Sequence, residues 1–102
     1  MGTTRSLQDE LKTILGSNNV YFRPPSSIRM KYPCFVVDRA GASQYAADNR
    51  NYIWKKKYTV TYISNESDPD MIDIMLNHFE ECRYDRPFVN DDLYHDVFTL
   101  FW

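Results

Sequence analysis

The sequence predicts a single α+β domain in which one mixed or antiparallel sheet of about five strands carries two helices on one face. The chain has 102 residues, a length that one hydrophobic core usually serves, so residues 1–102 are expected to form one domain. Two short segments repeat apolar residues at helical spacing, and most of the others are rich in β-branched and aromatic residues. The predicted order of elements is therefore α-β-β-β-α-β-β.

The first helix is predicted to start at Ser6, because a capping serine is followed three residues later by the acidic Asp9. Gly16 is the predicted end of this helix. The apolar positions, spaced i, i+4, i+7 and i+8, are Leu7, Leu11, Ile14 and Leu15.

Three strands should follow the first helix. Residues 20–23 read as a brief strand that the two prolines at 24–25 stop. Residues 34–38 form a compact strand rich in β-branched side chains. The small and polar residues 41–51 are expected to be a loop, and residues 52–63 a long strand.

Three adjacent lysines interrupt the long strand. Successive side chains of a strand alternate between faces, so Lys55 and Lys57 belong to a polar face and Lys56 to an aromatic one. The residues that share the face of Lys56 are Tyr52, Trp54, Tyr58, Val60 and Tyr62. A strand of this length spans about 36 Å at about 3.3 Å per residue, and we expect it to project beyond the rest of the fold.

The second helix is predicted to begin with Asp68 as its cap and Pro69 at its first position, and to end near Glu81. Its apolar stripe comprises Ile72, Met75, Leu76 and Phe79.

A closing hairpin should complete the fold, with a first strand at Phe88-Val89, a turn at 90–92 and a last strand at 93–102. Both faces of the last strand carry apolar residues. This strand is therefore expected near the centre of the sheet, or facing a neighbouring molecule.

Charge is distributed unevenly along the chain. Residues 1–66 hold ten Lys/Arg and five Asp/Glu, whereas residues 67–102 hold two Lys/Arg and nine Asp/Glu. A nucleic-acid-binding domain is usually basic as a whole, but the net charge here is −2. Separate positive and negative regions favour head-to-tail association of identical copies. Two alternatives remain open: ion pairs within one copy, or lysines that protect an edge strand.

The predicted contact between copies has a basic side and an acidic side. The basic side comprises Arg50, Lys55, Lys56 and Lys57. The acidic side comprises Asp68, Asp70, Asp73, Asp85, Asp91 and Asp92.

The sequence predicts no enzyme and no cofactor. Its three glycines cannot assemble a phosphate-binding loop or a dinucleotide fingerprint, and no nucleophile elbow is present. His95 and Asp96 are adjacent on a predicted strand and should point to opposite faces. His78 and Cys82 could meet, but two ligands do not make a zinc site.

The remaining acidic and thiol groups are expected to have ordinary roles. Asp85, Asp91 and Asp92 could attract a cation, although a solvated turn is the commoner meaning of such a group. Cys34 and Cys82 lack zinc spacing and are expected to be reduced thiols in apolar surroundings. No apolar run approaches the ~20 residues of a membrane span, so we expect a cytoplasmic protein without a membrane partner.

Four short strings occur in a specific order: VYFRPP at 20–25, MKYPC at 30–34, ADN at 47–49 and CRYDRPFVNDDLYHDVF at 82–98. In this order they resemble tail terminators, also called tail-completion proteins, a family encoded among the head-to-tail joining genes of long-tailed bacteriophages. The resemblance covers nearly the whole chain except the first helix. It departs from the family pattern by an extra alanine at 45–49 and by a tyrosine, in place of an asparagine, before His95.

The resemblance implies a structural virion protein with no catalytic residue. Such proteins form a ring, typically hexameric, that caps the tail tube, stops its growth and joins the tail to the head. The implied partners are other copies of the chain, the tail-tube protein and the neck or connector protein, with DNA only in transit through the lumen. The implied location is the virion tail or neck, and the host cytoplasm during assembly.

Two other functions remain open. A neck or head-closure protein of the same assembly would share the composition and the ring. A small nucleic-acid-binding module would use Tyr52, Trp54 and Tyr58 as stacking platforms beside the lysines.

Overall fold

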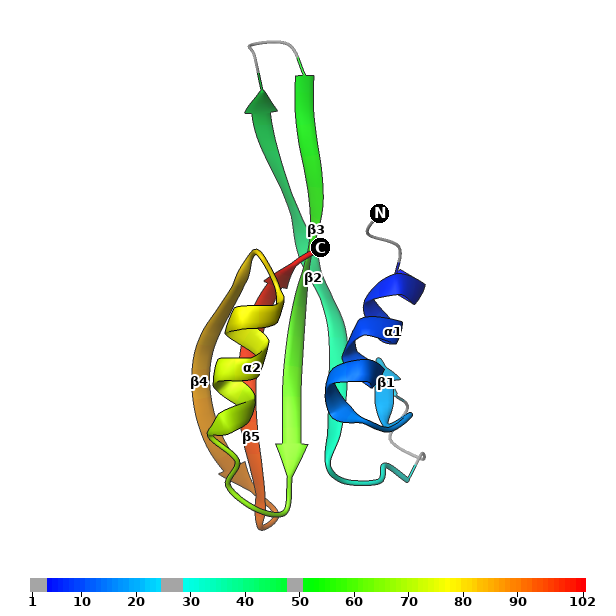
Figure 1. The fold of residues 1–102 in the computed structure, drawn as a ribbon, viewed down its shortest axis with the longest axis vertical. Helices are drawn as coiled ribbons and strands as arrows, with labels where there is room; N and C mark the ends of the chain where they lie inside the picture. The colour runs from blue at the N-terminus through cyan, green and yellow to red at the C-terminus, as the bar shows by residue number, and fades with distance from the viewer. Residues whose placement is uncertain (1–3, 25–28, 48–50) are drawn as a thin grey trace.

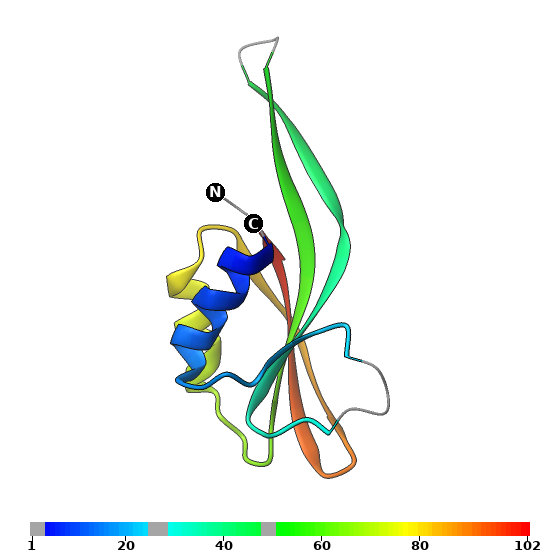
Figure 2. The same ribbon diagram turned by 90° about the vertical axis from the view of Figure 1, so that its right-hand side faces the viewer.

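The computed structural model describes residues 4–24, 29–47 and 51–102. In chain order its elements are α1 (Thr4–Leu15), β1 (Val20–Phe22), β2 (Cys34–Ala47), β3 (Asn51–Ser64), α2 (Asp70–His78), β4 (Cys82–Asn90) and β5 (Leu93–Phe101). The five strands form one sheet, and both helices lie on the same side of it (Figure 2). The predicted α+β class and order of elements are confirmed.

The strands are arranged in the order β1-β2-β3-β5-β4. β1 is parallel to β2, and the other neighbouring pairs are antiparallel, so the sheet is mixed. β5 lies between β3 and β4, which confirms that the last strand is internal. In Figure 1, α1 lies on the side of β1 and β2, whereas α2 lies on the side of β4 and β5.

The hydrophobic core fills the space between the sheet and the two helices. Tyr58, Val60 and Tyr62 of β3 all point into it, as the alternation of this strand predicts. The other buried members are Leu7, Leu11, Val20, Phe35, Val37, Met71, Met75, Phe79, Phe98 and Leu100. Full burial of a large apolar side chain stabilises a fold by about 1.5–3 kcal/mol, so this cluster is the main source of stability.

Three predicted helix boundaries need correction, the start of α1 and both ends of α2. α1 begins at Thr4, so Ser6 lies inside the helix and is not its cap. The N-cap of α2 is Pro69, and no side chain caps this helix. α2 ends at His78 because Phe79 adopts an extended conformation, with φ −102° and ψ 141°, and buries its ring in the core.

The prediction of a loop at 41–51 is wrong for the described residues, 41–47 and 51, which belong to strands. β2 continues without interruption to Ala47, and its last residues pair with the beginning of β3, as far as Asn51. An irregularity between Arg39 and Gly41 shifts the register, and Gly41 has a φ of +137°, which glycine adopts easily. Small residues have weak strand propensity, but pairing with a strongly strand-forming neighbour overrides it.

The first strand of the closing hairpin is also longer than predicted, because β4 spans nine residues. Pro87 fits there because β4 is an edge strand, where one backbone N–H is not needed by a neighbour. The predicted turn is confirmed: Asp91 and Asp92 have φ of +52° and +62°, the left-handed values of a two-residue hairpin turn. Aspartate tolerates this conformation better than most residues.

A two-stranded arm extends beyond the helices and the other strands (Figure 1). We define the arm as residues 43–47 of β2 with residues 51–55 of β3; the rest is the body. In the described chain these arm residues pair only with each other, because the pairing of β3 with β5 starts at Lys57. The molecule measures 49 × 27 × 22 Å along its principal axes, and the predicted projection of the long strand accounts for its length.

Candidate interaction surfaces

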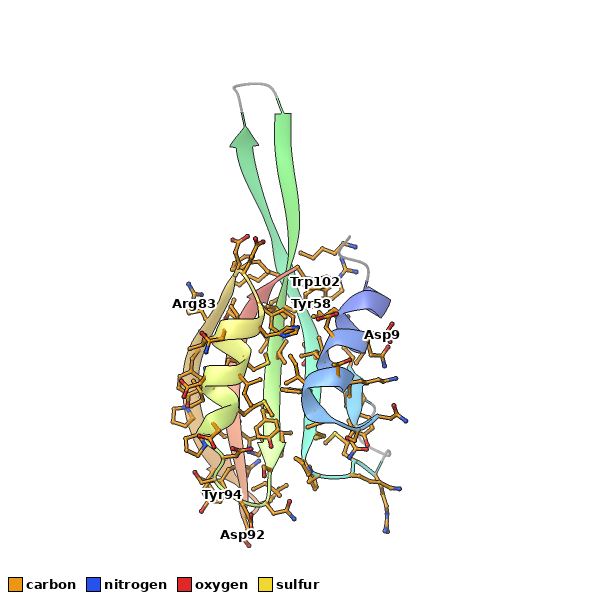
Figure 3. The ribbon with its side chains drawn as sticks, in the orientation of Figure 1. Asp9, Tyr58, Arg83, Asp92, Tyr94 and Trp102 are labelled. Atoms are coloured by element: carbon orange, nitrogen blue, oxygen red, sulfur yellow. The ribbon has the colours of Figure 1, made fainter. Side chains whose placement is uncertain are left out.

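Five carboxylates gather at the end of the body that lies away from the arm. Asp68 precedes α2, and Asp70 and Asp73 belong to its first turn, where negative charge favours the helix dipole. Asp91 and Asp92 form the β4–β5 turn at the same end of the sheet; Asp92 is labelled in Figure 3. We call these five residues the acidic end.

An open cavity of about 570 Å³ lies beside the acidic end, of whose residues only Asp68 lines it. It is lined by Pro33, Tyr62, Ser64, Asn65, Glu66, Ser67 and Asp68. The Tyr62 hydroxyl donates a hydrogen bond to an Asp68 carboxylate oxygen at 3.2 Å. Burial, and then the negative charge of Asp68, raise the pKa of Tyr62 to about 12, so this hydroxyl remains a donor at neutral pH. The Asp68 carboxylate thus holds the β3–α2 connection instead of capping α2.

Asp85 does not belong to the acidic end. It lies at an irregularity of β4 between Tyr84 and Arg86, which turns its carboxylate towards β5. There it accepts a hydrogen bond from the Thr99 hydroxyl at 2.6 Å and lies 3.5 Å from the Nε atom of Arg83. Asp91 is six residues further along the strand, about 20 Å away at about 3.3 Å per residue. The structure therefore does not bring Asp85 together with the turn aspartates.

The predicted basic side lies where the arm joins the body. Lys56 is exposed and Lys57 is half-buried. Arg50 lies outside the described residues, and of Lys55 only the backbone is described, paired with Ser43.

Edge protection does not explain Lys56 and Lys57. Lys57 pairs with β2 on one side and with Phe101 of β5 on the other. The backbone of Lys56 exchanges hydrogen bonds with Trp102 at 2.9 and 3.1 Å and pairs with Ala42. Both lysines thus lie on a strand that has neighbours on both sides, whereas lysines that prevent aggregation belong on open edges.

The lysines and the acidic end are far apart within one copy. Lys57 and Ser64, which lie at opposite ends of the body, are seven residues apart along β3, or about 23 Å. Among the described side chains, the ion pairs join Arg23 to Asp38, His78 to Glu10 and Arg83 to Asp85. None of these ion pairs joins one of the lysines to a carboxylate of the acidic end.

The two histidines have structural contacts. The Nε2 atom of His78 lies 2.5 Å from a carboxylate oxygen of Glu10 and so connects α2 to α1. The ring of His95 stacks on Phe88, with 4.4 Å between centroids. Asp96 accepts a hydrogen bond from the Tyr84 hydroxyl at 2.9 Å on the other face of the sheet. Within residues 4–24, 29–47 and 51–102, no three potential metal ligands come together.

Both cysteines are free thiols, Cys34 buried and Cys82 partly buried. Burial raises the pKa of each thiol to about 11, and the charge of Asp85 contributes at Cys82. A reactive cysteine would have a lowered pKa, so both fit the predicted apolar, reduced role. Tyr58 is completely buried, which removes it from the three proposed stacking platforms for nucleic acid.

A second group of cations, which the sequence did not reveal, lies beside β1. Arg23, Arg29, Lys31 and Arg39 are all exposed. The guanidinium of Arg23 donates a hydrogen bond to the backbone oxygen of Arg39 at 3.5 Å, and the backbone N–H of Lys31 donates to the Tyr21 hydroxyl at 3.1 Å. These residues are scattered over 17 positions of the sequence, so only the parallel pairing of β1 with β2 brings them to one place.

A scan against models of known protein families gave no match for this chain, and neither did a search of curated protein sequences. In the part of the chain that the structure describes, no helix has the length and apolar character needed to cross a membrane.

Proposed function

We propose that this chain is a structural virion protein of the tail-terminator class. Copies associate head to tail into a ring, typically a hexamer, that caps the tail tube, stops its elongation and joins the tail to the head. The observation that carries the proposal is the separation of charge within one copy. The acidic end and the lysines at the base of the arm lie at opposite ends of the body, and no described ion pair joins them.

Head-to-tail contact follows from this separation. Two different surfaces that attract each other form a heterologous contact, and a series of such contacts closes into a ring when the rotation between copies allows. Complementary potentials also speed encounter and select the correct partner. The four strings that resemble the tail-terminator family support the same assembly independently of the charges.

The proposed role requires surfaces and no bond chemistry. A ring seated on the last ring of the tube covers the surface on which the next tube subunit would bind, and so stops growth. Its other face then remains available to the neck. DNA passes through the lumen, and we expect a neutral or acidic wall there because tight phosphate binding would retard transit.

The experiment is to assemble tail-tube protein of the same virus with and without this chain and to measure tube lengths by electron microscopy. We expect capped tubes of limited length with the chain and tubes of uncontrolled length without it. Tubes of the same length distribution in both samples, together with no binding of the chain to tube ends, would refute the role.

The second candidate function is a neck or head-closure protein of the same assembly. It shares the ring and differs in the docking partner. Co-purification with tail-tube protein supports a terminator, whereas co-purification with portal or connector protein supports head closure.

A further inference from the structure

We infer that neighbouring copies meet laterally, with the cations beside β1 of one copy placed against the acidic end of the next. This inference rests on the proposed ring, and it assigns the positive side of the lateral contact to these cations instead of the lysines at the base of the arm. We call the cationic surface the β1 edge; it comprises Arg23, Arg29, Lys31 and Arg39.

The β1 edge has more positive charge than its local partners neutralise. Arg23 forms a 3.7 Å ion pair with Asp38, in which both side chains are more than half exposed. No ion pair involves Arg29, Lys31 or Arg39 among the described side chains. The edge retains a net positive charge.

The acidic end has negative charge without compensation in the same copy. Asp70, Asp73, Asp91 and Asp92 are all exposed, and no ion pair or hydrogen bond of their side chains occurs among the described residues. The stability of α2 and of the hairpin turn explains why aspartates occur at these positions. Neither of these local roles pairs the negative charges with a cation.

The two surfaces belong to opposite halves of the sheet. The strand order places β1 at one edge and β4 at the other, with α2 and the β4–β5 turn on the β4 side (Figure 1). If these two surfaces meet, each copy is related to the next by the same rotation and translation. Such a heterologous contact is the kind that can close into a ring. An isologous dimer would need both surfaces within one self-complementary patch.

On the β4 side, this contact should form through side chains and not through pairing of β4 with a strand of the neighbouring copy. Pro87 lacks a backbone N–H, and the irregularity at Asp85 disrupts the ladder, so the outer edge of β4 is a poor template for another strand. The edge also presents the exposed cations Arg83 and Arg86. We therefore place the neighbour against α2 and the turn at the acidic end, away from the middle of β4.

The test uses three charge-reversed variants and native mass spectrometry at low ionic strength. The first carries Asp70→Lys, Asp73→Lys, Asp91→Asn and Asp92→Asn, which change the acidic end from five negative charges to a balance of +1. The second carries Arg29→Glu, Lys31→Glu and Arg39→Glu, which change the β1 edge from four positive charges to a balance of −2, and the third combines all seven changes. Circular dichroism melting checks that each variant is folded. Asp91→Asn with Asp92→Asn is a milder variant that keeps the turn, because asparagine favours the same left-handed conformation.

The wild-type chain should assemble, and the first two variants should each need at least about tenfold more protein for half-assembly. An equimolar mixture of these two should assemble again, because every contact of an alternating ring then joins opposite charges. The third variant should assemble by itself for the same reason. The double asparagine variant should show a smaller shift in the same direction.

The outcomes separate this inference from the proposed function. If the wild type assembles and neither single-sided reversal weakens assembly, or if the mixture and the third variant stay monomeric while folded, the lateral contact is refuted and the ring remains. If the wild type is monomeric at low salt, alone and with tail-tube protein, the proposed function fails as well.

Discussion

The body and the arm of this molecule are held together by different means. The body packs two helices on a five-stranded sheet, and its largest side chains, such as Tyr58 and Phe98, are completely buried. The arm consists of two strands whose described residues pair only with each other (Figure 1). An isolated two-stranded hairpin is marginally stable in water. The body therefore has its core within one copy, whereas the described arm residues have only each other as sheet partners.

This contrast also locates the charges that the proposed assembly uses. The lysines lie at the junction of arm and body, and the acidic end lies at the far end of the body, about 23 Å away along β3. No described ion pair joins the lysines to the acidic end, so both surfaces can be proposed for contacts between copies. The following predictions test this separation, from the largest expected effect to the smallest.

Truncation in the body should cause the largest loss of stability. Phe98→Ala removes a completely buried ring that contacts Tyr84, and we expect a loss of about 3–5 kcal/mol in the free energy of unfolding. Val89→Ala is the matched control: this side chain is 63% exposed, and its truncation should change stability by less than about 0.5 kcal/mol. Urea unfolding measures both. Equal losses would show that burial in the body does not determine stability.

Shortening the arm should affect assembly far more than folding. Ser43 to Lys55 are replaced by Asn-Gly, a two-residue turn that joins the paired residues Ala42 and Lys56. We expect a change of less than about 1 kcal/mol in the free energy of unfolding, because the described residues of this segment pair in the sheet only with each other. Loss of the cooperative transition would mean that the arm is part of the folding unit. Sedimentation of the shortened chain then reports whether the arm contributes to assembly.

Alkaline pH should weaken the body through Tyr62. Its folded pKa is raised to about 12, above the ordinary value near 10, so its contribution is complete below pH ~10 and is lost as the pH rises towards 12. Between pH 9 and pH 11.5, the melting temperature of the Tyr62→Phe variant should therefore fall less than that of the wild type. Tyr84→Phe is a matched comparison, because the pKa of Tyr84 is also raised to about 12. Identical pH dependence of the wild type and both variants would contradict the raised pKa values of these hydroxyls.

The smallest effect concerns the thiols. Both cysteines are free and their pKa values are raised by burial, so the native protein should react slowly with a disulfide reagent at pH 8. Cys82, which is partly exposed, should react before Cys34, and both should react at once in denaturant. Cys82→Ser identifies the faster site. Rapid labelling of Cys34 in the native state would indicate that this end of β2 opens easily.

Local patterns predicted most of the elements but not their limits. The apolar spacing of α1 and α2 and the alternation of β3 and β5 depend on neighbours in the sequence, so they could be recognised directly. The acidic end was also predictable, because helix starts and hairpin turns favour aspartate for local reasons.

Tertiary effects explain the errors. The extension of β2 to Ala47 depends on pairing with β3, which outweighs the weak propensity of small residues. Asp85 was grouped with the turn because the irregularity that redirects its carboxylate towards Thr99 has no clear sequence signal. The β1 edge was missed because its cations are brought together only by strand pairing.

Sedimentation velocity of the wild-type chain in low and high salt tests the central claim most directly. If opposite charges on separate surfaces hold copies together, the chain should sediment as a closed oligomer in low salt and shift towards the monomer as salt screens the contacts. A monomer in low salt at high protein concentration, both alone and with tail-tube protein, would contradict the account. So would an oligomer whose mass does not change with salt.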